Sequence, residues 1–182
     1  MIKRLAALAL ALLLLSASAG AEERYSTVEV NGMTEVLGEI KYENPDAGFV
    51  CWYAPGFFSL LWDTLADPQG QLMLYCSRAE GTPAYLTAER PEKSGLKGKA
   101  FLKAAAGEDG IPEDALSPIE TYKSPQGDTF QFLSGTLDGV RFEYYSVRKK
   151  GKELLVRTRC PAADPDGWGV RLSHAVFSFD LR

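Results

Sequence analysis

Apolar and polar side chains alternate most regularly in the last third of the chain. The segments "DTFQFLSGTL" (128–137), "GVRFEYYSVRK" (139–149) and "ELLVRTRC" (153–160) show the period of two that is typical of β-strands. The turns "DG" (138–139) and "KKGK" (149–152) separate them, and such short connections join antiparallel neighbours. The pattern therefore predicts an antiparallel meander.

Strand alternation also assigns side chains to the faces of this meander. Phe142, Tyr144 and Ser146 share one face of their strand, and the next strand places three further residues on one face: Leu155, Arg157 and Arg159. The adjacent Tyr144 and Tyr145 point to opposite faces, which makes one of the two a candidate for a surface or a groove.

Shorter apolar segments in the first half of the chain predict further strands. "YSTVEV" (25–30) ends at the hairpin dipeptide Asn31-Gly32, and "EVLGEIKY" (35–42) continues as a second extended segment. "GFVCWYAP" (48–55) is apolar on both faces, which is typical of a strand that is covered on both sides. Two more strands are expected, at "QLMLYCS" (71–77) and "AYLTAE" (84–89).

Helical spacing of apolar residues occurs in two internal segments. Residues 57–66 place Phe58, Leu61, Trp62 and Leu65 at helical spacing, and "LKGKAFLKAAAG" (96–107) is rich in Ala and Lys and stops at a glycine. We therefore expect a short helix in each. The Pro-, Gly- and acid-rich residues 108–127 are expected to form a surface connection.

The stretch "RCPAADPDGWG" (159–169) is expected to join the last strand to a final helix. Its proline at 161 cannot continue the ladder of hydrogen bonds, Asp164 is a good N-cap, and Pro165 suits the first helical position. Trp168 starts one apolar side of the helix, which continues through Leu172, Ala175, Val176 and Phe179, whereas Arg171 and His174 lie outside it. We interpret Asp164, Pro165 and Trp168 as a structural joint.

The first 21 residues are typical of a cleaved signal peptide. Lys3 and Arg4 precede an apolar run at residues 5–15, and the small residues that follow allow cleavage after Ala19 or after Ala21. The apolar run is shorter than the roughly 18 residues that a membrane-spanning helix needs. We therefore expect a soluble exported protein, periplasmic or extracellular, with residues 22–182 as a single α+β domain and without stable membrane insertion after cleavage.

The charge balance argues against two classes of partner. The chain carries 20 Lys and Arg against 24 Asp and Glu, and its net charge is −4. Removal of Lys3 and Arg4 makes the mature chain more acidic still. Nucleic acids and anionic lipids are bound by basic surfaces, so neither is an expected partner.

Catalytic and metal-binding patterns are sparse. His174 is the single histidine, which is too few for most histidine-based zinc sites, and no G-x-S-x-G motif accompanies it. The run "DPDG" (164–167) resembles the start of a calcium loop but lacks the acidic ligands that would follow. Two S-x-x-K matches, Ser94 with Lys97 and Ser146 with Lys149, stand without the companion motifs of serine–lysine enzymes. We expect no metal and no cofactor.

The three cysteines allow two arrangements. Cys51 and Cys76 lie on expected strands that are joined by a short connection, and in an exported protein they are the expected disulfide, with Cys160 left as a thiol. The alternative is three buried thiols.

With these elements in order, the chain resembles the PsbP-type family, named for an extrinsic subunit of photosystem II. The resemblance rests on "GFVCWYAPGFF" (48–58), "VRFEYYSVRKKGKELLVRTRCP" (140–161) and "GWGVRLSHAVFSF" (167–179). It implies a central antiparallel sheet flanked by helices, an α/β/α sandwich, used for binding and scaffolding. The metal-associated histidines of the photosynthetic members have no counterpart here, so the resemblance implies no metal site.

These observations favour an exported, non-enzymatic binding or accessory module. Its partner is a protein or small molecule that the sequence does not identify. Two alternatives stay open: a carrier with a ligand cavity between sheet and helices, and a small serine–lysine hydrolase that uses Ser94 or Ser146.

Overall fold

Two antiparallel sheets and two short helices make up the part of the protein that the computed structural model describes, which is residues 22–67, 70–76, 83–90 and 95–182. The signal segment predicted over residues 1–21 and the candidate nucleophile Ser94 lie outside these ranges. Within them, no helix has the length and apolar character needed to cross a membrane.

The strands are ordered by hydrogen bonding as follows. The four-stranded sheet contains, in order, β1 (Glu23–Val30), β2 (Met33–Asn44), β3 (Phe49–Tyr53) and β11 (Asp180–Leu181). The seven-stranded sheet contains β4 (Ser59–Asp63), β5 (Gln71–Cys76), β6 (Ala84–Glu89), β10 (Lys152–Pro161), β9 (Val140–Lys149), β8 (Thr129–Leu137) and β7 (Glu120–Lys123). The helices are α2 (Gly98–Glu108) and α3 (Val170–Phe177), with single helical turns η2 (Glu113–Ala115) and η3 (Pro165–Gly169).

Two-residue turns set the register of the hairpins. Asn31 and Gly32 between β1 and β2 have φ of 52° and 75°, and Asp138 and Gly139 between β8 and β9 have φ of 51° and 75°. Positive φ at both positions matches the twist of paired strands, and Asn, Asp and Gly tolerate it best. The predicted hairpin and the predicted meander β8–β9–β10 are therefore confirmed.

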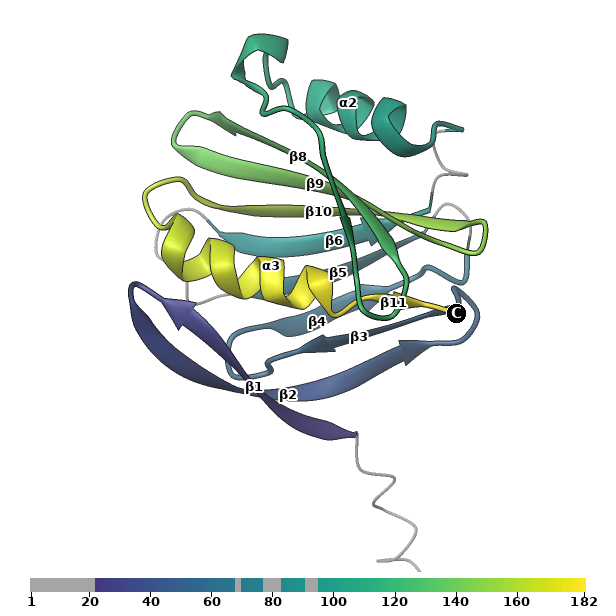
Figure 1. The fold of residues 1–182 in the computed structure, drawn as a ribbon, viewed down its shortest axis with the longest axis vertical. Helices are drawn as coiled ribbons and strands as arrows, with labels where there is room; N and C mark the ends of the chain where they lie inside the picture. Colours follow the sequence, from purple (N-terminus) through teal and green to yellow (C-terminus); the bar gives the residue numbers. More distant parts are fainter. Residues whose placement is uncertain (1–21, 68–69, 77–82, 91–94) are drawn as a thin grey trace, which may run out of the picture.

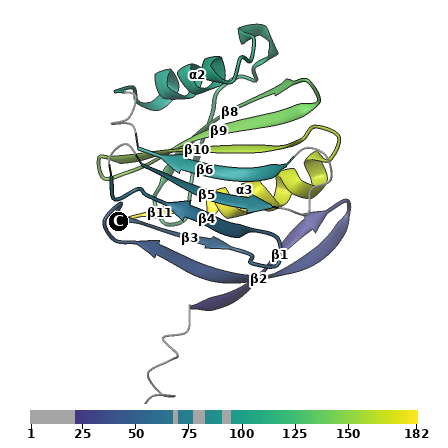
Figure 2. The ribbon, with the colours of Figure 1, turned by 180° about the vertical axis from the view of Figure 1, so that it is seen from behind.

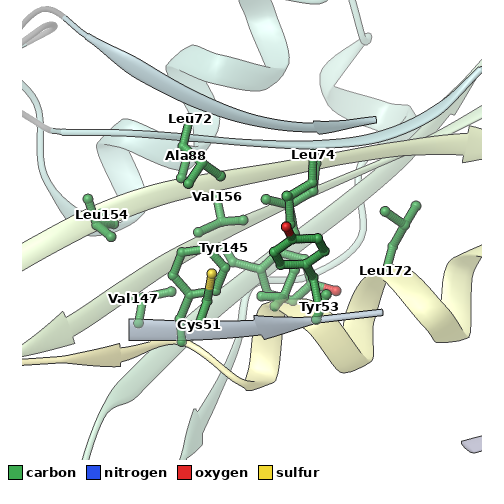
Figure 3. Packing of buried hydrophobic residues seen from close by; sticks show 14 of the residues in the cluster. Cys51, Tyr53, Leu72, Leu74, Ala88, Tyr145, Val147, Leu154, Val156 and Leu172 are labelled. Atoms are coloured by element: carbon green, nitrogen blue, oxygen red, sulfur yellow. The ribbon is translucent and has the colours of Figure 1, made fainter. Parts of the chain in front are cut away.

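The inner face of the seven-stranded sheet carries the main core. Leu74, Tyr145 and Val156 on this face are buried against Cys51 and Tyr53 of β3, as Figure 3 shows. Helix α3 lies on the same side of the sheet (Figure 1) and buries three residues of its predicted apolar side: Leu172, Ala175 and Val176. Strand alternation thus fixes which residues of β5, β9 and β10 face β3 and α3.

The outer face of the same sheet is covered only in part. Phe101 and Leu102 of α2 pack on Leu133, Tyr144 and Leu155, so α2 covers β8, β9 and β10. Strands β4, β5 and β6 lie in front of α3 in Figure 2, and Met73 and Thr87 stay partly exposed on this side. The described part of the chain has two helices, of 11 and 8 residues, and is therefore more sheet-dominated than the sandwich flanked by helices that we predicted.

The prediction of a helix over residues 57–66 is wrong, because Ser59–Asp63 forms the strand β4, which pairs with β5. A register shift between Leu60 and Trp62 breaks the alternation there. The bulge therefore produces a spacing of apolar residues that imitates a helix. Leu61 and Trp62 are in fact 49% and 46% exposed. Similarly, the surface connection expected over 108–127 includes the edge strand β7 and the turn η2.

The stretch 159–169 does connect a strand to a helix. Strand β10 ends at Pro161, and the chain turns helical at Pro165, first as the π-type turn η3 and then as α3. A Cβ on Gly167 would overlap the carboxylate of Asp164, so a larger residue there would require that side chain to move. Trp168 packs edge-on against Phe57 and Phe58, with ring centroids 6.0 and 6.3 Å apart. The capping role of Asp164 stays a prediction.

The expected disulfide between Cys51 and Cys76 is not formed in the structure. Cys51 lies on β3 of one sheet and Cys76 on β5 of the other, and all three cysteines are buried thiols. The two strands are therefore not the close neighbours that their short connection suggested. Burial raises the pKa of Cys51, with Asp63 adding to the effect, and burial followed by Glu143 raises the pKa of Cys160 to about 11. The thiols act as small apolar side chains of the core.

Candidate functional site

The serine–lysine arrangement at Ser146 and Lys149 is not assembled. Ser146 is fully buried, and its hydroxyl donates to Glu153 Oε1. The ammonium of Lys149 instead pairs with Asp180 and lies 3.6 Å from Asp128 Oδ2. The two side chains lie on opposite faces of β9, because three positions separate them in a strand.

The single histidine lies in a polar cluster between α3 and the β1–β2 hairpin. His174 Nε2 is 2.9 Å from Ser26 Oγ and 3.2 Å from Glu39 Oε1. A catalytic triad needs the serine and the acid on opposite ring nitrogens, so that one orients the ring and the other exchanges a proton. Here both partners share Nε2. The cluster therefore ties the helix to the hairpin. His174 lies outside the buried side of α3, and its side chain is 25% exposed.

Glu39 is the buried centre of this cluster. Its residue is 2% exposed, and its carboxylate accepts a hydrogen bond of 2.8 Å from Arg24 Nε. Burial acts to raise the pKa of Glu39, but the hydrogen bonds from His174 and Arg24 outweigh it and lower the pKa from 4.5 to about 2.

Replacing Glu39 with glutamine is expected to remove part of the pH dependence of stability. Because the pKa is 4.5 unfolded and about 2 folded, the stabilisation is complete above pH 4.5 and is lost as the pH falls towards 2. We expect E39Q to be less stable than wild type by about 2 kcal/mol at pH 7, with the difference narrowing below pH 4.5. Urea unfolding from pH 7 to pH 2.5 measures this, with the exposed Glu22→Gln as control. A difference that stays constant across this range would contradict the assignment.

Metal ligands are not gathered anywhere in the described ranges, where no group of three or more His, Cys, Asp or Glu side chains is placed to hold an ion. Of the two acids of the "DPDG" run, Asp164 is half-buried against Gly167 and Asp166 is exposed. The run enters the helical turn at Pro165, so its last three residues form the start of η3.

A groove of about 410 Å³ lies on the outer face of the seven-stranded sheet, beside the C-terminal end of α2. It exists because α2 covers only β8–β10, which leaves the side chains of β5 and β6 without a helix above them among the described residues. Its lining combines aromatic, aliphatic and charged groups, as ligand sites do. The lining includes Trp62, Met73, Tyr85, Thr87, Phe142 and Arg159.

One side of the groove is an ion-pair network around Arg157. Its Nη2 lies 2.8 Å from Glu89 Oε1 and 2.7 Å from Glu108 Oε2, and its Nη1 lies 3.6 Å from Asp109 Oδ2. Burial acts to lower the pKa of Arg157, but Glu108 and Glu89 outweigh it and raise the pKa. Tyr144 donates a 2.8 Å hydrogen bond to Asp109 from below this network. Arg157 is thus fully engaged in holding α2 to the sheet.

The other side of the groove holds Arg159 in a different way. Its guanidinium carbon lies 5.3 Å from the ring centroid of Phe142 and 6.0 Å from that of Tyr85. Among the described residues no carboxylate lies within 4.0 Å of it, and its buried Nε has no hydrogen-bond partner. Register explains the placement, because Arg159 pairs with Phe142 on β9 and with Tyr85 on β6.

Sequence reasoning placed Arg157 and Arg159 on one face but did not identify the groove. The signal was present in "LLVRTRC", where two cations alternate on a strand with buried neighbours. Tyr144 and Tyr145 do point to opposite faces, one under α2 and the other in the main core. The expectation that one of them reaches a surface or a groove is wrong, because they are 0% and 2% exposed.

Comparison with known proteins identifies the fold. No model of a known protein family matches the sequence, and no curated protein is similar to it. The structure is similar to the solution structure of cyanobacterial PsbP (CyanoP) from Synechocystis sp. PCC 6803, with a TM-score of 0.55 and 12% sequence identity. The match covers 79% of this chain and 92% of that chain. The predicted PsbP-like resemblance is confirmed, and at this identity it extends to the fold.

Proposed function

We propose that this protein is an exported, non-enzymatic accessory module that binds a small ligand in the groove on the outer face of its seven-stranded sheet. The observation that carries the proposal is Arg159, a cation in the groove wall that has no acidic partner among the described residues. The groove also lies beside the C-terminal end of α2, on the part of the sheet that α2 leaves uncovered among the described residues.

The polar side chains that could have been catalytic are hydrogen-bonded to one another, which favours a binding role over catalysis. Ser146 is fully buried and donates to Glu153, and Ser26 and Glu39 meet the same nitrogen of His174. Neither arrangement offers an accessible nucleophile with a base that could activate it. We therefore propose the binding role and do not retain the hydrolase based on Ser146.

The PsbP-like fold and the signal-like first 21 residues support the remaining parts of the proposal. The fold is shared with PsbP of Synechocystis, and the resemblance implies binding and scaffolding. Lys3, Arg4 and the apolar run 5–15 support export to the periplasm or the exterior.

Replacing Thr87 with tryptophan tests the proposal, because Thr87 lies on the groove floor between Met73 of β5 and Arg157 of β10. We expect saturation-transfer NMR to show that the mature wild-type protein binds members of a library of small organic molecules. The T87W variant is expected not to bind these molecules. Thr121→Trp is the matched control, because it adds the same bulk on the exposed strand β7 of the same sheet. Ligands that bind T87W and wild type equally would show that the groove is not the site.

A further inference from the structure

We infer that the groove selects an organic monocarboxylate with a flat apolar portion, and that Arg159 binds the carboxylate. This inference rests on the proposed function and names the chemical class of its ligand.

Among the described residues, Arg159 lacks the acidic partners that its neighbour Arg157 has. Arg157, two positions away, has three acids within 4.0 Å, whereas Arg159 has none among the described residues. Within the same described ranges, the buried Nε of Arg159 also lacks an acceptor. A buried donor without a partner costs free energy, and such groups in folded proteins call for an explanation. An anion that enters the groove would supply the missing charge.

The shape of the guanidinium and the charge of the groove indicate which kind of anion fits. The planar guanidinium matches the two oxygens of a carboxylate or a phosphate. The groove lining holds two arginines and three acids, Glu89, Glu108 and Asp109, so its formal charge is −1. A doubly charged phosphate monoester would be repelled by this lining more strongly than a singly charged carboxylate. The charge of the groove therefore favours the carboxylate.

The aromatic and apolar side chains of the groove indicate what the rest of the ligand is. Tyr85 and Phe142 flank the guanidinium, and Met73 and Trp62 extend the apolar lining across β5 and β4. Trp62 is 46% exposed although it is a large aromatic residue. Flat apolar groups stack favourably on such rings, which places an aromatic or similarly flat portion of the ligand beside the carboxylate.

A matched series of three probes tests the inference: 3-phenylpropionate, the neutral 3-phenylpropanol and the phosphate monoester of that alcohol. We expect the mature wild-type protein to bind the carboxylate about tenfold more tightly than either other probe. Arg159→Gln should lower carboxylate affinity to that of the alcohol and leave alcohol binding unchanged. Arg148→Gln is the matched control, because Arg148 also has a buried Nε without a partner but does not line the groove.

Several outcomes would overturn the inference. They are carboxylate binding by R159Q equal to that of wild type, tighter binding of the phosphate ester, and no carboxylate binding to wild type at about 1 mM. A second readout uses the unmodified protein: the Nε–H resonance of Arg159 should shift when the carboxylate is added, and that of Arg148 should not. The T87W variant separates the two proposals. If T87W abolishes binding but R159Q does not, only the role of Arg159 fails, whereas carboxylate binding that survives in T87W places the site outside the groove.

Discussion

Replacing Phe49 with alanine is expected to lower the free energy of unfolding by about 4 kcal/mol. Phe49 is 0% exposed, and its ring stacks on that of Phe179 with centroids 5.4 Å apart. It also pairs through the backbone with Leu181 of β11. Its removal would leave a cavity where β3, β11 and the end of α3 meet, and a packed core relaxes only partly into such a space. Urea unfolding followed by fluorescence measures the loss.

The control for this variant is Tyr25→Ala, because Tyr25 is 79% exposed on β1 of the same sheet. We expect Y25A to change stability by no more than about 0.5 kcal/mol. If F49A lost as little unfolding free energy as Y25A, Phe49 would not be a core residue. The packing of β3 against β11 and the end of α3 would then be wrong.

Replacing Glu143 with alanine is expected to cost about 3 kcal/mol or more. Glu143 is 4% exposed on the inner face of β9. Its carboxylate accepts hydrogen bonds from Arg141 Nε and the Tyr145 hydroxyl, both at 2.8 Å, and from Thr158 and Ser173 at 3.2 and 3.3 Å. Alanine would leave several buried donors without their acceptor and would remove one of the two hydrogen bonds that tie Ser173 of α3 to β9, leaving that with the Tyr145 hydroxyl at 3.2 Å.

Glu113→Ala is the matched control for this loss. Glu113 also pairs with a cation, Lys103 at 2.7 Å, but its side chain is 83% exposed. Exposed ion pairs contribute little, so we expect E113A to be nearly as stable as the wild type. Thermal melts and urea titrations of both variants measure the difference. If E113A were as destabilised as E143A, burial would not be what makes the Glu143 cluster important.

Local sequence patterns predicted the elements whose contacts are local. The dipeptides Asn31-Gly32 and Asp138-Gly139 predicted two hairpins, because few residues accept positive φ, and alternation predicted the meander. The pattern failed at 57–66, where one bulge in β4 shifted the alternation and imitated a helix.

Long-range pairings were not accessible from the sequence. Nothing in "AYLTAE" indicates that β6 pairs with β10, yet this pairing brings Tyr85 beside Arg159 and so forms one wall of the groove. The expected disulfide failed for the same reason, since the assignment of Cys51 and Cys76 to different sheets is a property of topology. The groove itself depends on how far α2 extends across the sheet, which composition does not reveal.

The pairing of β11 with β3 also constrains the order in which the chain folds. Trp52 N donates to Ser178 Oγ across 126 positions of sequence, and β11 follows directly. At a synthesis rate of about 5 to 20 residues per second, β3 would wait roughly 6 to 25 seconds for this partner. During that time an apolar strand edge stays open, and open edges of this kind aggregate. The topology therefore leaves this edge of β3 unpaired until the last strand has been made.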